Sequence, residues 1–310
     1  MRNFLIIPIL FIFLVSCSNS EDFDIPKISK LEKLEEHSNQ FIKGIYSYDN
    51  GIHVAIGFGI ANSIMVEGEG GNIIIDTTDD VSQAKEVLSE FQKINQNPIK
   101  AIIYTHNHGD HVFGASEFYN AQEEKPLVIA HSTTAEKVEK ILGIINPIIT
   151  LRSGKMFGTN LDDNELINVG LGPYLSAGRS SPGYIAPTMT FEKELKLEIA
   201  GHKVELYHAP GETDDQLFVW FPELSALMPG DNFYTTFPNL YTIRGTSHRD
   251  VIGWVNSIDK MRSLDPQYLF PSHTMPVEGE EISNALIIYR DGMQYCLLYT
   301  SPSPRDAIPS

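Results

Sequence analysis

Short apolar segments next to glycine-rich turns fill the first third of the chain. Three such runs occur at 52–59 ("IHVAIGFG"), 61–68 ("ANSIMVEG") and 71–77 ("GNIIIDT"). Runs of this length, bounded by glycine and polar residues, predict short strands that follow one another as a meander. Two further apolar runs, 99–105 ("IKAIIYT") and 126–131 ("PLVIAH"), predict strands that are buried on both faces.

Amphipathic segments lie beside these predicted strands. Residues 79–95 ("DDVSQAKEVLSEFQKIN") carry apolar side chains near helical spacing, and Asp79 or Asp80 is a suitable N-cap. Residues 133–143 ("TTAEKVEKILG") predict a second helix. The region 143–183 is rich in glycine, serine and proline, which favours a loop over an active site rather than a part of the core.

The second half of the chain repeats this pattern. Residues 189–211 alternate polar and apolar positions about the turn "AGHK" and predict a hairpin. Strands are predicted at 216–222, 225–231 and 266–273, with a helix at 248–264 before the last of them. Two similar halves of this kind predict an α/β protein in which two sheets pack face to face with helices outside.

The N-terminal segment has the composition of a secretory signal. Residues 1–17 ("MRNFLIIPILFIFLVSC") place one arginine before a continuous apolar run. The end of this run, "LVSC", resembles the lipobox of bacterial lipoproteins, which implies that Cys17 is lipidated; an ordinary cleaved signal is the alternative. Residues 18–40 are polar and charged and predict a tether. A short helix that begins at Ile28 is compatible with this stretch. These features predict an exported bacterial lipoprotein, periplasmic or associated with the outer membrane, that touches the membrane only through its lipid anchor.

The last residues have a different character. Residues 296–310 ("CLLYTSPSPRDAIPS") contain three prolines and do not continue the preceding helical pattern. The stretch "CLLYTSPSPRD" resembles a translated sequencing-library adapter. We therefore expect a non-native tail from 296, with native sequence ending near Tyr295.

The charge of the chain limits its partners. The formal net charge of the 310 residues is -17, which argues against nucleic acid or an anionic lipid surface. An anionic substrate is compatible with this charge only where a local positive charge, such as a metal ion, dominates the site.

A cluster of histidines indicates such a metal site. The stretch 105–111 ("THNHGDH") contains three of the ten histidines. A strand that ends at Tyr104 delivers His106 and His108 to one side, because alternate residues share a face, and the next turn carries Asp110 and His111 to a second point. A polar loop that holds histidines by chance is the alternative.

Three more candidate ligands also follow predicted strands: Glu212 in "HAPGET", Asp231 in "MPGDN" and His273 in "FPSHT". Together with 105–111, the order and context of these motifs through residues 41–279 resemble the metallo-β-lactamase superfamily. The resemblance implies a four-layer αβ/βα sandwich at 41–285, with two Zn²⁺ at one edge. The implied ligands of the first zinc are His106, His108 and Glu212, those of the second are Asp110, His111 and His273, and Asp231 bridges the two. Asp76, at the end of "NIIID", either orients a ligand or caps its strand.

Two features resemble the alkylsulfatase branch of this superfamily. One is Glu212, where most members have histidine, and the other is "NLYTIRG" after Asp231. The resemblance implies that Asn239 and Arg244 bind sulfate, and a guanidinium fork suits a tetrahedral oxyanion. Asp231 departs from the branch, which usually bridges with glutamate. The stretch "PGETDDQ" is about one residue short, so Asp214 or Asp215 is an alternative to Glu212.

The branch also implies domains beyond the catalytic one. Residues 286–295 would begin a helical dimerisation domain, and the full-length form would be a homodimer. The implied function is zinc-dependent hydrolysis of small-molecule alkyl sulfate esters by a metal-bound hydroxide, with Asp110 and Asp231 as catalytic carboxylates. The alternatives are another hydrolase of the same fold (a lactonase, β-lactamase or phosphodiesterase) or a non-catalytic zinc-binding lipoprotein.

Overall fold

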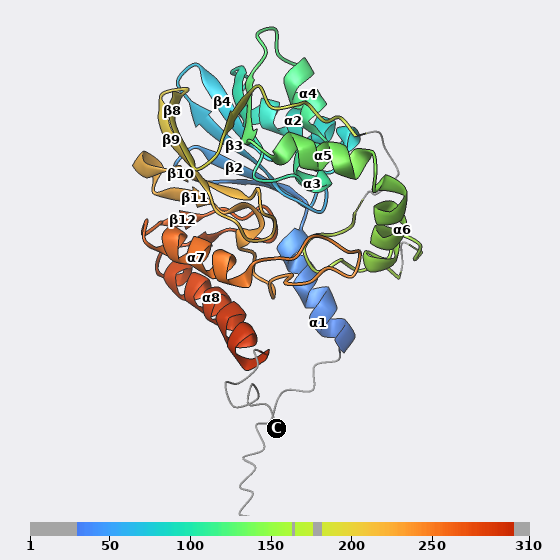
Figure 1. Ribbon diagram of the computed structural model, residues 1–310. Coiled ribbons are helices and arrows are strands. Elements are labelled where there is room, and N and C mark those ends of the chain that lie inside the picture. The colour runs from blue at the N-terminus through green and yellow to red at the C-terminus, as the bar shows by residue number, and fades with distance from the viewer. Residues whose placement is uncertain (1–29, 163–164, 176–181, 301–310) are drawn as a thin grey trace, which may run out of the picture.

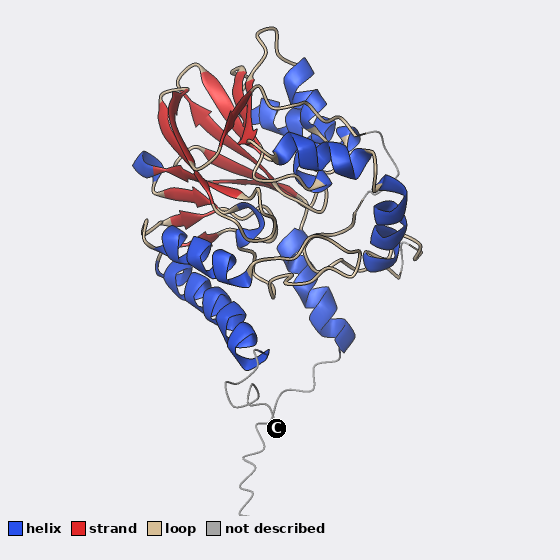
Figure 2. Ribbon diagram, in the orientation of Figure 1, coloured by secondary structure: helices blue, strands red, loops and turns tan. Residues whose placement is uncertain are grey.

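Two β-sheets lie face to face at the centre of the structure, and helices cover the outer face of each (Figures 1 and 2). The computed structural model describes residues 30–162, 165–175 and 182–300. The strands of the first sheet, in spatial and chain order, are β1 (Gly44–Ser47), β2 (Ile52–Ile56), β3 (Ser63–Gly68), β4 (Gly71–Ile75), β5 (Ile99–Ile103), β6 (Leu127–His131) and β7 (Met189–Phe191). Those of the second are β13 (Val277–Glu278), β12 (Tyr268–Leu269), β11 (Ala226–Met228), β10 (Leu217–Phe221), β9 (His202–His208) and β8 (Glu194–Ile199).

Helices occupy the outer layers. Those of the described residues are α1 (Lys30–His37), α2 (Val81–Ile94), α3 (Gly109–Val112), α4 (Ala115–Asn120), α5 (Thr134–Leu142), α6 (Asn146–Met156), α7 (Val251–Arg262) and α8 (Glu280–Thr300), with short 3₁₀ turns at η1 (Ser38–Phe41), η2 (Pro222–Leu224) and η3 (Gly230–Asn232). Figure 1 shows α2, α4 and α5 beside the first sheet and α7 and α8 beside the second. The predicted α/β class and four-layer order are therefore confirmed.

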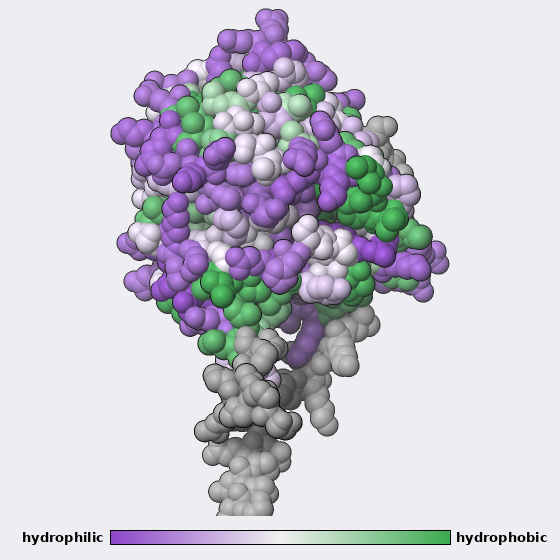
Figure 3. All heavy atoms as spheres, in the orientation of Figure 1, coloured by the Kyte–Doolittle hydropathy of each residue, from purple (hydrophilic) through white to green (hydrophobic). Residues whose placement is uncertain are grey.

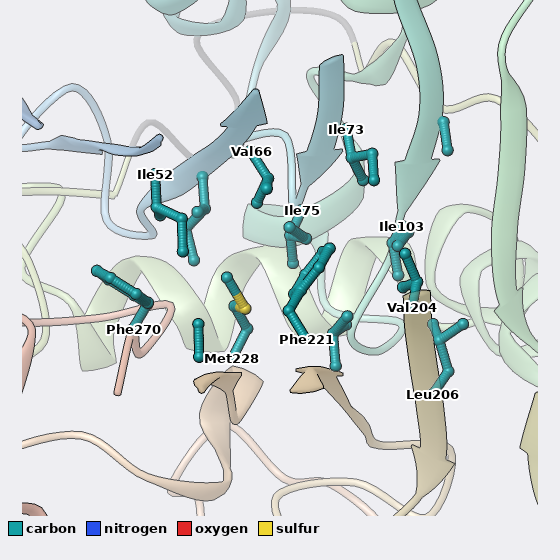
Figure 4. Packing of buried hydrophobic residues seen from close by; sticks show 14 of the residues in the cluster. Ile52, Val66, Ile73, Ile75, Ile103, Val204, Leu206, Phe221, Met228 and Phe270 are labelled. Atoms are coloured by element: carbon teal, nitrogen blue, oxygen red, sulfur yellow. The ribbon is translucent and has the colours of Figure 1, made fainter. Parts of the chain in front are cut away.

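The two sheets meet through an apolar core. Side chains from both, such as Ile75 on β4 and Phe221 on β10, point toward one another and are fully buried (Figure 4). Each fully buried side chain of this size contributes roughly 1.5–3 kcal/mol. A second core packs Phe91 of α2 against the first sheet, and a third packs Trp254 of α7 against the second. The apolar residues of the alternating and amphipathic patterns thus form three apolar layers. These layers separate the four layers of helices and sheets.

The strand directions bring the candidate ligands to one edge. In the first sheet, β4 and β5 are parallel, so Asp76 and the 105–111 stretch follow neighbouring carboxyl ends. In the second sheet, β11 and β12 are parallel, and Asp231 and His273 follow their carboxyl ends. Loops after the carboxyl ends of parallel strands are where side chains from distant parts of a chain converge.

The local predictions are largely confirmed. The hairpin of β8 and β9 turns at Ala200 and Gly201, both with positive φ. Asp80 caps α2, because its side chain accepts a hydrogen bond from the backbone N–H of Gln83 at 2.9 Å.

The region 143–183 contains a helix where a loop was expected. Pro147 lies in the first turn of α6, where its missing N–H costs nothing. Ile144, Ile148 and Leu151, one on the approach to α6 and two on it, are exposed by 84%, 57% and 66%. Because these three apolar side chains face outward, α6 lacks the pattern of a helix packed on a core, and the sequence analysis did not predict it.

One helix lies within the expected tether, where the sequence analysis allowed a short helix, and another crosses two of the expected domain boundaries. α1 lies within the stretch expected to be a tether, and its His37 Nε2 lies 2.9 Å from the carbonyl oxygen of Gly170. α8 runs as one helix from Glu280 to Thr300, and its Leu286 and Met293 are fully buried in the core beside α7. The boundaries at 40, 285 and 295 stay predictions. Residues 1–17, with Cys17, and 301–310 lie outside the described residues.

None of the helices among the described residues combines the length and the hydrophobicity needed to cross a bilayer.

Candidate metal centre

The loop after β5 places the first group of candidate ligands. His106 Nε2 and His108 Nδ1 lie 2.9 Å apart, and His106 Nε2 lies 3.7 Å from Asp231 Oδ2. The potential ligand atoms of His106, His108 and Asp231 all lie within 4.8 Å of one another. Sequence-distant β5 and β11 therefore supply one compact group, because their carboxyl ends share an edge of the sandwich.

The short helix α3 places the second group. Asp110 Oδ2 lies 3.3 Å from His111 Nε2 and 3.5 Å from His273 Nε2. Asp231 stands between the two groups, since its carboxylate oxygens also lie 3.4 Å from His111 Nε2 and 3.2 Å from His273 Nε2. The structure thus brings these six predicted ligands together at one edge of the sandwich, and their binding of metal stays a prediction.

The polar atoms of this cluster fit a metal better than one another. His111 Nε2 and Asp231 Oδ1 are buried, and despite these short distances neither atom forms a hydrogen bond of good geometry with any of the described residues. Buried polar atoms of this kind are rare unless they bind an ion or water. Imidazole and carboxylate are ligands that Zn²⁺ accepts in proteins, so the residues present fit zinc.

Charges within the cluster favour a cation there. Burial lowers the pKa of His111, but the carboxylates of Asp231, Asp110 and Asp76 outweigh burial and raise that pKa well above its usual value. Burial, helped by the charge of His111, lowers the pKa of His106 to about 4. Burial raises the pKa of Asp231, but His273 and the other neighbouring histidines lower it well below its usual range. The buried carboxylate of Asp231 therefore stays ionised and attracts positive charge.

Glu212 lies beside the first group. Its Oε1 is 4.0 Å from His108 Nδ1, and its Oε2 is 2.5 Å from Nη1 of Arg249. Burial raises the pKa of Glu212 to about 7, against the opposing charge of Arg249. Glu212 and Asp214 both line the cavity that His108 lines. Among the three acids in "PGETDDQ", Glu212 is the one whose carboxylate lies 4.0 Å from the His108 ring.

The alternatives to Glu212 are engaged elsewhere. Asp214 forms an ion pair with Lys137 at 2.6 Å. Asp215 is fully buried and accepts hydrogen bonds from Thr134 Oγ1 at 2.7 Å, from Thr213 Oγ1 at 2.8 Å and from Asn107 Nδ2. Asp215 therefore supports the loop around the histidines without joining them.

Asp76 contacts both the end of the neighbouring strand and a candidate ligand. It directly follows β4 with a φ of 56°, and its Oδ1 accepts a hydrogen bond from the backbone N–H of Thr105 at 2.8 Å. Its Oδ2 lies 2.7 Å from His111 Nδ1. A carboxylate at Nδ1 leaves Nε2 as the free ring nitrogen directed at a metal.

Arg244 lies at the wall of a cavity next to the cluster. The cavity has a volume of about 750 Å³ and is lined by both metal groups, by Asn239 and by α6. Arg244 Nη2 is 3.4 Å from His108 Nε2, and its guanidinium carbon is 5.9 Å from the ring centre of Phe157. No carboxylate among the described residues forms an ion pair with Arg244, although it is largely buried. Its charge is therefore available to an anion in the cavity.

Sequence reasoning missed Arg249. This residue is 5% exposed and forms an ion pair with Glu212. The sequence offered one weak signal, an arginine five positions after Arg244 within a stretch, 232–249, that contains no acidic residue.

Comparisons with known proteins agree with this geometry. The family model of the metallo-beta-lactamase superfamily matches residues 56–273, and the chain belongs to this superfamily. It is 39% identical over 238 residues to a linear primary-alkylsulfatase of Pseudomonas sp. (strain ATCC 19151), covering 74% of this chain and 45% of that protein. A second linear primary-alkylsulfatase of Pseudomonas sp. is 28% identical, covering 82% of this chain and 39% of that protein. The resemblance to alkylsulfatases predicted from the motifs is confirmed, and the chain spans less than half the length of these relatives.

A solved structure supports the fold. The stereoselective inverting sec-alkylsulfatase Pisa1 from Pseudomonas sp. superposes with a TM-score of 0.80 at 23% identity, covering 87% of this chain and 44% of that one.

Proposed function

We propose that this protein is a zinc-dependent hydrolase of alkyl sulfate esters. The observation that carries the proposal is Arg244, a largely buried guanidinium that forms no ion pair with a carboxylate of the described residues and lies beside His108 in the cavity that both metal groups line. A sulfate ester is an anion, so it needs such a charge in a protein whose net charge is -17. The alkylsulfatase relatives add support through their printed activity.

Two zinc ions would be held by the seven candidate ligands at this edge of the sandwich. His106, His108 and Glu212 would hold the first, Asp110, His111 and His273 the second, and Asp231 would bridge them. When bound, the zinc ions supply positive charge and a hydroxide nucleophile near neutral pH. Asp231, which is buried, and Asp110, which is partly buried, would contribute carboxylate oxygens, and the contact of Asp76 with Nδ1 of His111 would leave Nε2 of that ring for the metal.

The chain's own residues would orient the substrate. The guanidinium of Arg244 offers a planar fork of N–H donors to the sulfate oxygens. Asn239, on the same cavity wall, would donate from its amide. Apolar side chains also line this cavity, among them Ile145, Ile149 and Met156 of the α6 region, and these suit an alkyl tail. Figure 3 shows an apolar surface where Figure 1 places α6, which continues this environment outward.

The proposal is tested with a panel of substrates. We expect purified protein loaded with zinc to hydrolyse dodecyl sulfate and to turn over a lactone, a β-lactam and a phosphodiester at least about 100-fold less efficiently, because Arg244 favours a sulfate. Removal of zinc by a chelator should abolish turnover, and added zinc should restore it. A preference for the lactone, the β-lactam or the phosphodiester would overturn the assignment and favour another hydrolase of this fold.

We also propose that the protein is an exported lipoprotein, anchored through Cys17, and that its full-length form is a homodimer. Support comes from the sequence of residues 1–17 and, for the dimer, from the branch that the chain resembles.

A further inference from the structure

Arg249 is a buried arginine at the end of the loop that carries Asn239 and Arg244. It is 5% exposed, and its described partners converge on a single nitrogen. Nη1 donates one hydrogen bond to Glu212 Oε2 at 2.5 Å and a second to the carbonyl oxygen of Asn239. Nε and Nη2 have no hydrogen-bond partner among the described residues. One nitrogen therefore joins a candidate metal ligand to a candidate substrate ligand.

The contact with Arg249 sets the orientation of the Glu212 carboxylate. Arg249 holds Oε2, which leaves Oε1 as the oxygen that faces His108, at 4.0 Å from Nδ1. The main chain at Glu212 is fixed separately, because its N–H donates to Asn232 Oδ1 at 3.2 Å. With both its backbone and its outer oxygen held, Glu212 presents one oxygen to the first metal group.

The peptide groups of Asn239 are held from both sides. Its carbonyl oxygen accepts from Arg249, and its N–H donates to the hydroxyl oxygen of Tyr234 at 2.9 Å. Tyr234 is itself fully buried beneath the site. The position of Asn239 in the cavity wall thus depends on the same arginine that orients Glu212.

We propose that Arg249 is a positioning residue that links the first metal position to the substrate-binding loop. This inference rests on the proposed roles of Glu212 and Asn239. Partners that hold a metal ligand from behind typically raise metal affinity by about 10–100-fold. Because a single nitrogen makes both contacts, a lysine ammonium, with three donors on one nitrogen, should replace much of what Arg249 does.

Zinc affinity provides the primary test. We expect Arg249→Met to weaken one of two zinc sites by about 10–100-fold, measured by competition with a chromogenic chelator. At a chelator concentration where the unmodified protein keeps two zinc ions per chain, this variant should keep one, held by Asp110, His111 and His273. Arg249→Lys should recover most of the lost affinity. When zinc is added to saturation, Arg249→Met should still show a raised KM for dodecyl sulfate, because the Asn239 carbonyl has lost its donor.

Arg262→Met is the matched control. Arg262 also forms an ion pair, with Asp259 at 2.9 Å on α7, but it does not line the cavity. This control should keep two zinc ions and an unchanged KM. If Arg249→Met keeps both zinc sites at unchanged affinity, or if Arg262→Met loses zinc equally, the inference is wrong. The inference also fails if Arg249→Lys binds zinc no better than Arg249→Met. If Arg249→Met does not fold, the comparison of Arg249→Lys with Glu212→Gln replaces it, and the lysine variant must then bind zinc more tightly.

Zinc binding separates this inference from the proposed function. A protein that binds two zinc ions, loses one in Arg249→Met and hydrolyses no sulfate ester would contradict the proposed function while supporting the role of Arg249 at Glu212.

Discussion

Asp76 Oδ2 lies 2.7 Å from His111 Nδ1, and both side chains are fully buried. The same oxygen accepts a hydrogen bond from Ser272 Oγ at 2.7 Å, and Thr105 donates to Oδ2 from its hydroxyl and to Oδ1 from its backbone. One carboxylate at the end of β4 therefore binds the loops that carry His106, His111 and His273. The geometry of the second metal group depends on it.

Asp76→Asn should weaken zinc binding at the second position by about 10–100-fold, because an amide cannot accept from all of these donors. Zinc titration of the variant checks this. Ser272→Ala is the control, since it removes one hydrogen bond from the same oxygen and leaves the contact with His111. A larger loss in Ser272→Ala than in Asp76→Asn would show that the contact between Asp76 and His111 does not hold the site.

Glu212 and Asp215 should respond differently to loss of charge. Glu212→Gln should lose zinc from the first position, whereas Asp215→Asn should keep two zinc ions. Asp215→Asn should instead lower the free energy of unfolding by about 1.5–3 kcal/mol, because the buried carboxylate of Asp215 accepts three hydrogen bonds. Zinc content and thermal unfolding of both variants check this. Loss of zinc in Asp215→Asn with a full complement in Glu212→Gln would reverse the ligand assignment.

The core between the sheets should dominate stability. Phe221 is fully buried there, so Phe221→Ala should lower the free energy of unfolding by about 3–5 kcal/mol. Phe237, which is 65% exposed, is the matched control, and Phe237→Ala should change stability by less than about 0.5 kcal/mol. Denaturant unfolding measures both, and equal losses would mean that the inter-sheet packing is wrong.

Much of the candidate site was predictable because its candidate ligands follow strand ends. The pattern "THNHGDH" places three candidate ligand histidines and Asp110 after one buried strand, so they could be named without knowledge of tertiary contacts or burial. The two-sheet architecture was predictable because the apolar positions of the alternating and amphipathic patterns are the positions that the fold buries.

Other parts of the structure depend on contacts that sequence spacing does not encode. The contact of Arg249 with Glu212, 37 residues earlier in the chain, exists only in the folded protein, so sequence spacing did not indicate a role for Arg249. α6 was missed because its apolar residues face the surface and the cavity rather than a core. Our preference for Glu212 over Asp215 as a candidate ligand depends on the sequence-distant Thr134, whose hydroxyl donates a hydrogen bond to Asp215.

Anchoring through Cys17 predicts a change in location. Cys17→Ser should release the protein from the membrane fraction, because stable anchoring needs the several acyl chains of a mature lipoprotein. Fractionation of cells that express the unmodified and variant proteins checks this. A Cys17→Ser protein that remains in the membrane fraction would contradict the lipobox interpretation.

The role of Arg244 distinguishes a sulfatase from another hydrolase of this fold. A desolvated charge-assisted fork contributes roughly 2–4 kcal/mol, so Arg244→Ala should lower kcat/KM for dodecyl sulfate by about 100-fold or more. Arg244→Lys should recover only part of this loss, because an ammonium cannot reproduce the fork. Zinc content should not change, since Arg244 is not a ligand.

The most direct measurement is therefore the ratio of kcat/KM for dodecyl sulfate to that for a neutral ester, in the unmodified protein and in Arg244→Ala at equal zinc content. The account predicts that this ratio falls by about 100-fold, through loss of sulfate turnover alone. An unchanged ratio, whether both substrates are unaffected or both are impaired equally, would contradict the sulfate-binding role and with it the proposed function.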